Sequence, residues 1–251
     1  MPPDVLVGCC GFSVSRKRYF ESLNSVEIQR TFYKLPREST AEKWRREAPP
    51  GFTYTLKAWA ALTHSPGSIV WRKSGISCEG CGDLKPTEAN FRAWGMVLKI
   101  ARALEATFVV FQSPPSFSRT EERVSDLRDF FSSLERDGLR LGWEPRHESW
   151  WADRESLASL MDELDLTHVV DPTVGEPLDS GPVAYFRLHG RWERGRIIYN
   201  HQYSEEELSN ILRAVERELE RRERAYVMFN NGRFMFDDAL RFLSMLSSQS
   251  K

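Results

Sequence analysis

Short β-rich runs alternate with amphipathic helical segments along almost the whole chain. About eight such runs can be read, at 4–8, 25–29, 52–58, 106–112, 139–144, 166–171, 183–190 and 225–231. Two intervening segments, 85–106 and 204–224, carry apolar residues at helical spacing and begin near Thr87 and Ser204, which suit helix N-caps. Parallel strands need crossover connections, so alternating βα units predict a parallel sheet. About eight units in 251 residues predict an α/β fold, a TIM-like (β/α)8 barrel forming a single domain.

A doubly wound open sheet is the alternative fold for such a pattern. That fold binds dinucleotides through a glycine-rich loop after its first strand. The first run here is followed by GCCGFS at 8–13, which lacks the glycine spacing of that loop. We therefore expect the barrel, with one long irregular insertion at about 60–85 after the third strand, a length typical of functional or mobile loops. His64 in this insertion suits either a second acid/base group or a loop cap.

The charge and hydropathy of the chain limit its possible partners and its location in the cell. It has 35 Lys and Arg against 36 Asp and Glu, so its overall charge neither requires nor excludes an anionic partner. No window approaches the roughly 18 consecutive apolar residues of a membrane helix, and the first residues lack the basic start and apolar core of a signal peptide. We therefore expect a cytoplasmic protein with no membrane partner, and the oligomeric state stays open.

Nearly every predicted strand ends in a polar side chain. In a TIM barrel, the C-terminal strand ends surround the active site. An unpaired charge after an apolar run costs several kcal/mol, so such a residue usually has a partner or a ligand. The alternative is that these groups satisfy loop backbones and pair with one another. We predict catalytic residues at Glu27, Lys57, Glu144, Asp171 and His189, and substrate-binding residues at Gln29, Tyr33, Gln112, Arg146, Arg187, Arg191, Asn230 and Asn231.

A series of motifs in a fixed order resembles a known family. The motifs are VGCCGF at 7–12, VEIQRTFYKLP at 26–36, GFTYTLKAWAALTH at 51–64, FVVFQSPPSF at 108–117, WEPRHESWW at 143–151, VDP at 170–172, YFRLHG at 185–190 and YVMFNN at 226–231. Over most of the chain this set resembles the DUF72 family, also called YecE-like proteins. The resemblance implies a TIM barrel, in agreement with the strand count, but it implies no particular reaction.

The predicted catalytic residues suit general acid/base chemistry. Paired carboxylates in a desolvated pocket can split their pKa values, so that one holds a proton while the other stays charged. Lys57 and Arg187 could hold them ionised instead. Hydrolysis of a glycosidic or phosphate ester bond is the leading hypothesis. A Schiff base on Lys57 is a second option, but nearby acids favour a structural ion pair of Lys57 with Glu27 or Glu144.

The four cysteines raise the question of metal or redox chemistry. A barrel could bring the adjacent pair Cys9 and Cys10 together with Cys78-x-x-Cys81 of the long insertion. The C-x-x-C spacing fits zinc, an iron–sulfur cluster, a disulfide or free thiols, and these alternatives stay open. Carboxylates and imidazole also suit other divalent metals, and four predicted catalytic groups offer them: Glu27, Glu144, Asp171 and His189.

Basic residues gather in loops that should lie on the rim of the barrel. They lie in SRKRYF at 15–20, RTFYKLPR at 30–37, VWRKS at 70–74 and HGRWERGR at 189–196. Arginine recognises phosphate through paired hydrogen bonds, and the interleaved aromatic residues could stack on bases or sugars. The sequence therefore favours a hydrolase acting on an anionic phosphate- or sugar-containing substrate, including nucleic acid. The alternative is a non-catalytic barrel that binds nucleic acid or protein.

Overall fold

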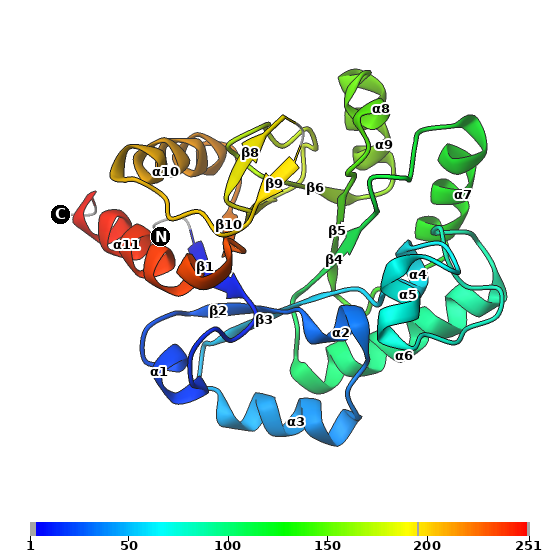
Figure 1. Ribbon diagram of the computed structural model, residues 1–251, viewed down its shortest axis with the longest axis horizontal. Helices are drawn as coiled ribbons and strands as arrows, with labels where there is room; N and C mark the ends of the chain where they lie inside the picture. Colours follow the sequence, from blue (N-terminus) through cyan, green and yellow to red (C-terminus); the bar gives the residue numbers. More distant parts are fainter. Residues whose placement is uncertain (1–3, 195, 250–251) are drawn as a thin grey trace.

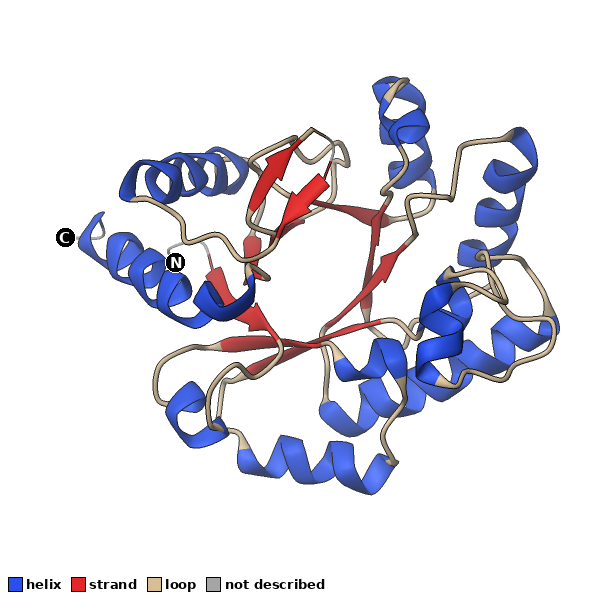
Figure 2. Cartoon of the chain, in the orientation of Figure 1, coloured by secondary structure: helices blue, strands red, loops and turns tan. Residues whose placement is uncertain are grey.

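The backbone forms a closed parallel barrel (Figures 1 and 2). The computed structural model describes residues 4–194 and 196–249. The strands follow one another around the barrel in the order β1-β10-β7-β6-β5-β4-β3-β2. Their bounds are β1 (Asp4–Cys10), β2 (Ser25–Ile28), β3 (Thr53–Lys57), β4 (Phe108–Gln112), β5 (Arg140–Glu144), β6 (Leu166–Val170), β7 (Val183–Leu188) and β10 (Arg224–Phe229). The predicted (β/α)8 barrel is confirmed.

Helices lie outside the strands, as Figure 2 shows. The predicted N-caps are confirmed: the Thr87 side chain accepts a hydrogen bond from Asn90 N at 3.1 Å, and Ser204 forms a capping box with Glu207. The helices are α1 (Arg16–Phe20), α2 (Arg30–Tyr33), α3 (Glu38–Glu47), α4 (Ala60–Thr63), α5 (Ile69–Ser74), α6 (Glu88–Leu104), α7 (Glu121–Ser132), α8 (Glu148–Trp151), α9 (Arg154–Glu163), α10 (Glu205–Leu219), the 3-10 helix η1 (Gly232–Phe234) and α11 (Met235–Gln249). Among the residues described, no helix has the length and apolar character needed to cross a membrane.

Aromatic side chains fill the barrel interior. The ring of Phe108 lies 4.5 Å from that of Tyr185, which stacks on Tyr226 at 5.1 Å. Gly142 of β5 makes room for them, because a Cβ there would lie 2.6 Å from Phe108 and from Val169. The barrel is therefore a packed core rather than a channel, and its buried charged groups Glu27, Lys57, Glu144 and Arg187 lie toward the C-terminal ends of their strands.

The insertion after β3 is more regular than predicted. It contains the short helices α4 and α5, and α5 ends at Gly75 in the left-handed conformation with φ 62°. The irregular part begins after this glycine. The buried Asn90 of α6 holds that part, because its side chain bonds the backbone of Gly82 in both directions at 3.0 Å and that of Lys85 at 2.8 Å. These bonds fix the insertion as a wall beside the end of β3.

Two departures from a regular barrel lie around β7. The connection from β6 to β7, 171–182, contains no described helix, and Figure 1 shows α10 well separated from α9. This loop is fixed by the buried ion pair of Asp179 with Arg222, at 2.7 Å. After β7 the chain forms a hairpin of β8 (Arg191–Glu193) and β9 (Arg196–Ile198). The hairpin leaves the C-terminal end of β7, so it borders the predicted site.

Candidate functional site

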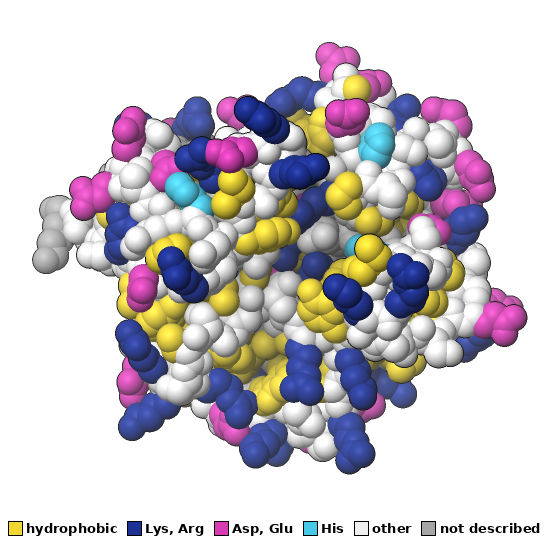
Figure 3. Space-filling view, in the orientation of Figure 1, with side chains coloured by type: hydrophobic (Ala, Val, Ile, Leu, Met, Phe, Trp, Pro, Cys, Tyr) yellow, Lys and Arg dark blue, Asp and Glu magenta, His cyan; other side chains and the backbone are white. Residues whose placement is uncertain are grey.

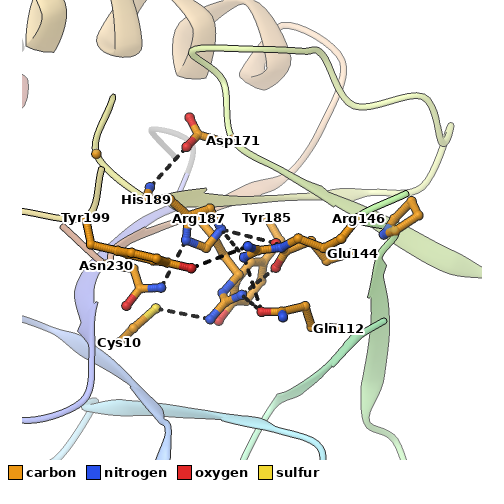
Figure 4. A network of polar contacts seen from close by, with 12 residues as sticks. Cys10, Gln112, Glu144, Arg146, Asp171, Tyr185, Arg187, His189, Tyr199 and Asn230 are labelled. Carbon is orange, nitrogen blue, oxygen red and sulfur yellow. Dashed lines mark hydrogen bonds and ion pairs between the residues drawn. The ribbon is translucent and has the colours of Figure 1, made fainter. Parts of the chain in front are cut away.

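Arg187 of β7 lies at the centre of a buried polar network (Figure 4). Its guanidinium donates to Glu144 of β5, to Gln112 of β4 at 3.0 Å and to Glu27 of β2 at 3.0 Å. Burial alone lowers the pKa of Arg187, but the carboxylates of Glu27 and Glu144 raise it well above its usual value. One permanently charged group thus joins four strands at the C-terminal end of the barrel.

Arg146 is a second guanidinium in the same network. Its Nε donates to Glu144 Oε1 at 2.5 Å, and its Nη2 donates to Gln112 at 3.2 Å. Pro145 lies between Glu144 and Arg146 and directly follows β5, where a residue without an N–H suits a strand end. Burial raises the pKa of Glu144, yet Arg146 and Arg187 hold it well below its usual range. Of the two interpretations of the carboxylates, this geometry favours the one in which cations keep Glu144 ionised. It does not favour a pair of carboxylates that shares one proton.

His189 is held between Glu144 and Asn230. Its Nε2 lies 3.1 Å from Glu144 Oε1 and 2.9 Å from Arg146 Nη2, while its Nδ1 lies 3.0 Å from Asn230 Nδ2. Burial lowers the pKa of His189, although Glu144 acts in the opposite direction. The imidazole is therefore a fixed, neutral ring beside the two guanidinium groups.

Asp171 lies next to this network but is engaged by the loops. Its Oδ1 accepts from Thr173 N at 3.0 Å and from the Thr173 hydroxyl at 2.7 Å. Its Oδ2 accepts from His189 N at 3.0 Å and from Trp192 Nε1 at 3.1 Å. These contacts tie the β6 loop to the end of β7 and to the hairpin. Among the predicted catalytic residues, Asp171 has the geometry of a positioning group.

Lys57 has an environment that the sequence did not indicate. Its side chain is 6% exposed, and its Nζ lies 3.6 Å from the centroid of the Phe32 ring. Within the described part of the chain, Nζ forms neither an ion pair nor a hydrogen bond, so the predicted pairing with Glu27 or Glu144 is wrong. Burial, followed by Arg187, lowers the pKa of Lys57 to about 7. Arg187 pairs with Glu27 and Glu144, whose carboxylates would otherwise keep the Lys57 ammonium charged.

His64 belongs to the same wall of the site. Its ring lies 5.2 Å from that of Phe32, and its Nδ1 lies 2.8 Å from the Thr63 hydroxyl. Burial and the neighbouring Lys57 lower the pKa of His64 to about 4. The imidazole is neutral near pH 7 and adds no charge beside Lys57.

The predicted substrate-binding residues divide into two groups. Gln112, Arg146, Arg187 and Asn230 join the network, and Gln29 donates to Glu27. Tyr33 is 52% exposed on α2 and contacts Phe32. The exposed Arg191 pairs with Glu193 in the hairpin. The buried Asn231 donates to His201 O at 2.9 Å and to Asp238 at 2.7 Å, so it fixes α11 rather than facing the network.

The four cysteines do not form a common site. Successive strand residues face opposite sides, so Cys9 packs in the layer outside the barrel and Cys10 in its interior. Cys78 and Cys81 form a disulfide. No group of three or more His, Cys, Asp or Glu suited to a metal ion occurs in residues 4–194 and 196–249. Of the alternatives left open for the cysteines, the structure has the Cys78–Cys81 disulfide and free thiols at Cys9 and Cys10, so an iron–sulfur or zinc site shared by all four is wrong. Glu27, Glu144, Asp171 and His189 likewise form no such group in the described residues.

The two free thiols are also poor nucleophiles. Burial raises the pKa of Cys9 to about 12, and its Sγ lies 3.3 Å from Met235 O. Burial and the carboxylate of Glu27 raise the pKa of Cys10 well above its usual value. Since the thiolate is the reactive form, both cysteines are inert near neutral pH.

The sequence prediction missed two tyrosines that belong to the site. The Tyr185 hydroxyl donates to Glu27 Oε2 at 2.8 Å and contacts the Thr55 hydroxyl at 2.7 Å. The Tyr199 hydroxyl, after the hairpin, lies 3.4 Å from Arg146 Nη1 (Figure 4). The two-residue period of a strand places Tyr185 on the same face as Arg187, and this signal could have identified it. No comparable period reaches Tyr199, which follows a separate hairpin.

A cavity of about 640 Å³ opens beside the network. Arg146 and His189 line its inner end, and Trp151 and Trp192 contribute aromatic walls. Figure 3 shows Lys, Arg and apolar side chains around a central hollow. The C-terminal end of the barrel thus combines buried cations, an unpaired lysine and a cavity large enough for a small molecule.

The comparisons with known proteins agree with this fold. The UPF0759 protein YunF of Bacillus subtilis is 25% identical over 231 residues, and the match covers 82% of this chain and 76% of that protein. A DUF72 family protein from Thermotoga maritima is 26% identical, with a TM-score of 0.75 and coverage of 97% and 99% of the two chains. A D-tagatose 3-epimerase-like protein, 14% identical over 97% of this chain and 96% of its own, shares the barrel with a TM-score of 0.59. The model of the family described as protein of unknown function DUF72 matches residues 15–251, and the chain therefore belongs to the DUF72 family.

Proposed function

We propose that this protein is a hydrolase that cleaves a phosphate ester in an anionic, sugar-containing substrate at the C-terminal end of the barrel. The observation that carries the proposal is the unpaired Lys57, whose buried amine has a pKa of about 7. A general base works best when its pKa lies near the working pH. The neutral amine can take a proton from an attacking water without first breaking an ion pair.

The guanidinium groups of Arg187 and Arg146 have different roles in the proposed reaction. Arg187 is wholly buried and engaged by Glu27, Glu144 and Gln112, so it serves to hold the network together. Arg146 lines the cavity. Its Nε and Nη2 are engaged by Glu144, Gln112 and His189, whereas its Nη1 has, among the described residues, only the 3.4 Å contact to the Tyr199 hydroxyl. We therefore assign to Arg146 the binding of the phosphate and the stabilisation of the charge that develops on the leaving oxygen.

The ionised state of Glu144 favours phosphate ester over glycoside hydrolysis. Glycoside hydrolysis commonly needs one carboxylic acid that keeps its proton at working pH. Arg146 and Arg187 hold the pKa of Glu144 well below its usual range, so Glu144 is unsuited to that role. A neutral amine beside fixed cations matches the needs of an anionic ester instead. The barrel neighbour named for a sugar epimerase is in keeping with a sugar-containing substrate.

The pH dependence of turnover tests this proposal. A panel of p-nitrophenyl phosphates, phosphodiesters and glycosides should show turnover of a phosphate ester, with a rate that rises through about pH 7 as Lys57 loses its proton and then levels off. The rate should be followed by absorbance between about pH 5 and about pH 9, around the expected pKa. Turnover confined to glycosides, or a phosphatase rate that is flat across this range, would contradict the proposal.

A non-catalytic nucleic-acid-binding barrel is the second candidate. It is favoured by exposed basic residues on elements that border the C-terminal end: Arg30, Lys34, Arg72, Lys73, Arg191, Arg194 and Arg196. Such a surface binds phosphate backbones without needing a buried base. Salt-dependent binding of a single-stranded oligonucleotide without any turnover would support this candidate over the hydrolase.

The hairpin arginines provide a test of that candidate. If the rim binds nucleic acid, replacing Arg191, Arg194 and Arg196 together by serine should weaken oligonucleotide binding strongly at low salt and little at high salt, because ions already screen exposed charges there. Fluorescence anisotropy at several salt concentrations measures this. The matched control replaces three exposed arginines of α6 and α7, Arg92, Arg102 and Arg128, which lie on the outer helices. An equal loss at all ionic strengths would indicate a structural role instead.

A further inference from the structure

The cavity beside the network has walls that are fixed before any ligand arrives. The Trp151 indole N–H donates to Pro145 O at 3.1 Å, and its ring lies 4.8 Å from the buried His168 ring. Gly175 packs so closely that a Cβ there would lie 3.1 Å from Trp151. These three contacts fix the indole plane of Trp151.

Trp192 forms a second fixed aromatic wall. Its indole N–H donates to Asp171 Oδ2 at 3.1 Å, the carboxylate that also holds His189 N. Both indoles that line the cavity therefore use their polar N–H on the protein and can offer their ring surfaces to a ligand. Val170, the last residue of β6, and Val174 add apolar surface to the cavity lining. A planar ring suits such walls because stacking on an aromatic side chain needs no hydrogen bond from it.

The cavity lining carries charges of both signs. The carboxylates of Glu144 and Asp171 are already engaged, and Glu148 is exposed. Arg146, with a side chain that is 9% exposed, is the more buried cation of the lining. Arg146 and the neutral His189 belong to the buried part of the lining, while Arg154 is exposed. A ligand that fills the space would place its anionic group by Arg146 and its apolar ring by the tryptophans. The cavity of about 640 Å³ lies within the range of about 300–1,000 Å³ that is common for small-molecule sites.

We propose that this cavity binds the base of a nucleotide, with the phosphate at Arg146. The inference rests on the proposed hydrolase function, which requires an anion and a sugar. The fixed aromatic walls add a planar ring, and a nucleotide is the class of molecule that combines all three groups. The nucleotide could be free or the terminal unit of a polynucleotide, since the two share this chemistry.

Binding to the Lys57→Met chain tests the inference apart from turnover. Isothermal titration calorimetry should show that adenosine 5′-monophosphate binds at least about tenfold more tightly than ribose 5-phosphate, which lacks the base. An equal affinity for the two compounds would overturn the inference. A parallel titration with a short single-stranded oligonucleotide identifies the source: tighter binding per site than the mononucleotide indicates a polynucleotide, and equal binding indicates a free nucleotide.

Two variants locate the bound base. Trp151→Ala should reduce the affinity for adenosine 5′-monophosphate by about tenfold and leave that for ribose 5-phosphate unchanged. Trp151 also packs against His168, so its replacement can destabilise the fold. A second variant therefore changes an exposed side chain: Val174 is 53% exposed and lines the cavity. Val174→Glu should weaken adenosine 5′-monophosphate binding to a similar degree. The matched control is Met96→Glu, at a 50% exposed position on α6. Equal affinities of the Val174→Glu and Met96→Glu chains would overturn the inference.

The two proposals fail in different ways. Hydrolysis of simple phosphate esters with no preference for a base would leave the hydrolase proposal standing and remove the nucleotide inference. Base-dependent binding that is lost in Val174→Glu, with no hydrolysis by the wild-type chain, would leave the nucleotide site standing and remove the proposed reaction.

Discussion

Replacing Lys57 by methionine is expected to reduce turnover of a phosphate ester by about 10²- to 10⁴-fold, the usual contribution of a general base. The residual rate should lose the rise through about pH 7, because the titrating amine is gone. Methionine keeps a similar length and retains the contact with the Phe32 ring. Steady-state kinetics over a pH series on the wild-type and Lys57→Met chains measures both effects.

The same replacement should not destabilise the fold. The Lys57 pKa is about 10.5 in the unfolded chain and about 7 in the folded one, so between these values the unfolded chain binds a proton that the folded chain does not. The free energy of unfolding of the wild type should therefore fall as pH is lowered from about 10.5 to about 7, and Lys57→Met should abolish this part. At pH 7 the variant should be more stable by roughly 1–4 kcal/mol, given that each pKa unit corresponds to about 1.4 kcal/mol.

An exposed lysine provides the matched control. Lys99→Met on α6 should leave turnover, its pH profile and the stability unchanged. A Lys57→Met chain with wild-type turnover would contradict the assignment of the base. Urea titration of the Lys57→Met chain separates loss of activity from unfolding. We expect a free energy of unfolding above that of the wild type, so a lower value would indicate that activity is lost because the chain unfolds.

Replacing Arg187 by methionine should have the opposite effect on stability, lowering the free energy of unfolding by about 3–5 kcal/mol. The change leaves Glu27 and Glu144 buried without the guanidinium that joins them. It also removes the hydrogen bond to Gln112 at 3.0 Å, so four strand ends lose their common partner. Urea unfolding at neutral pH measures the loss.

Arg191→Met is the control for this second prediction. Arg191 is exposed, and its partner Glu193 is exposed as well, so its loss should change stability by less than about 1 kcal/mol. Equal stabilities of the Arg187→Met and Arg191→Met chains would show that the buried network does not stabilise the barrel. The Arg187→Met chain should also lose activity, since the network positions Glu144 and Arg146.

The place of the site could be predicted from the sequence because it follows from the fold. The βα alternation implies a barrel, and the barrel brings the strand ends that carry Glu27, Lys57 and Glu144 to one face. The partners within that face could not be predicted in the same way. A strand pattern tells which side a residue faces but gives no distances across the barrel, so nothing in the sequence shows that Arg187 rather than Lys57 pairs with the two glutamates.

The errors have similar physical causes. Asn231 follows Asn230 directly, but the change of direction into η1 and α11 turns its side chain to Asp238 and His201. The vicinal Cys9 and Cys10 were grouped by sequence proximity, whereas the pleat of β1 sends them to opposite faces. The aromatic walls at Trp151 and Trp192 lie on α8 and β8, two short elements outside the barrel strands, so the strand pattern does not place them.

The pKa of Lys57 is the most direct test of this account. Competitive acetylation of the native protein over a pH series, quantified for each lysine by peptide mass spectrometry, gives the titration midpoint of the individual amines. We expect a midpoint near 7 for Lys57, shifted by burial and by Arg187. The exposed Lys99 of α6 is followed in the same samples as the internal reference. A Lys57 midpoint near 10.5, the value before burial shifts it, would contradict the proposal that Lys57 acts as the base.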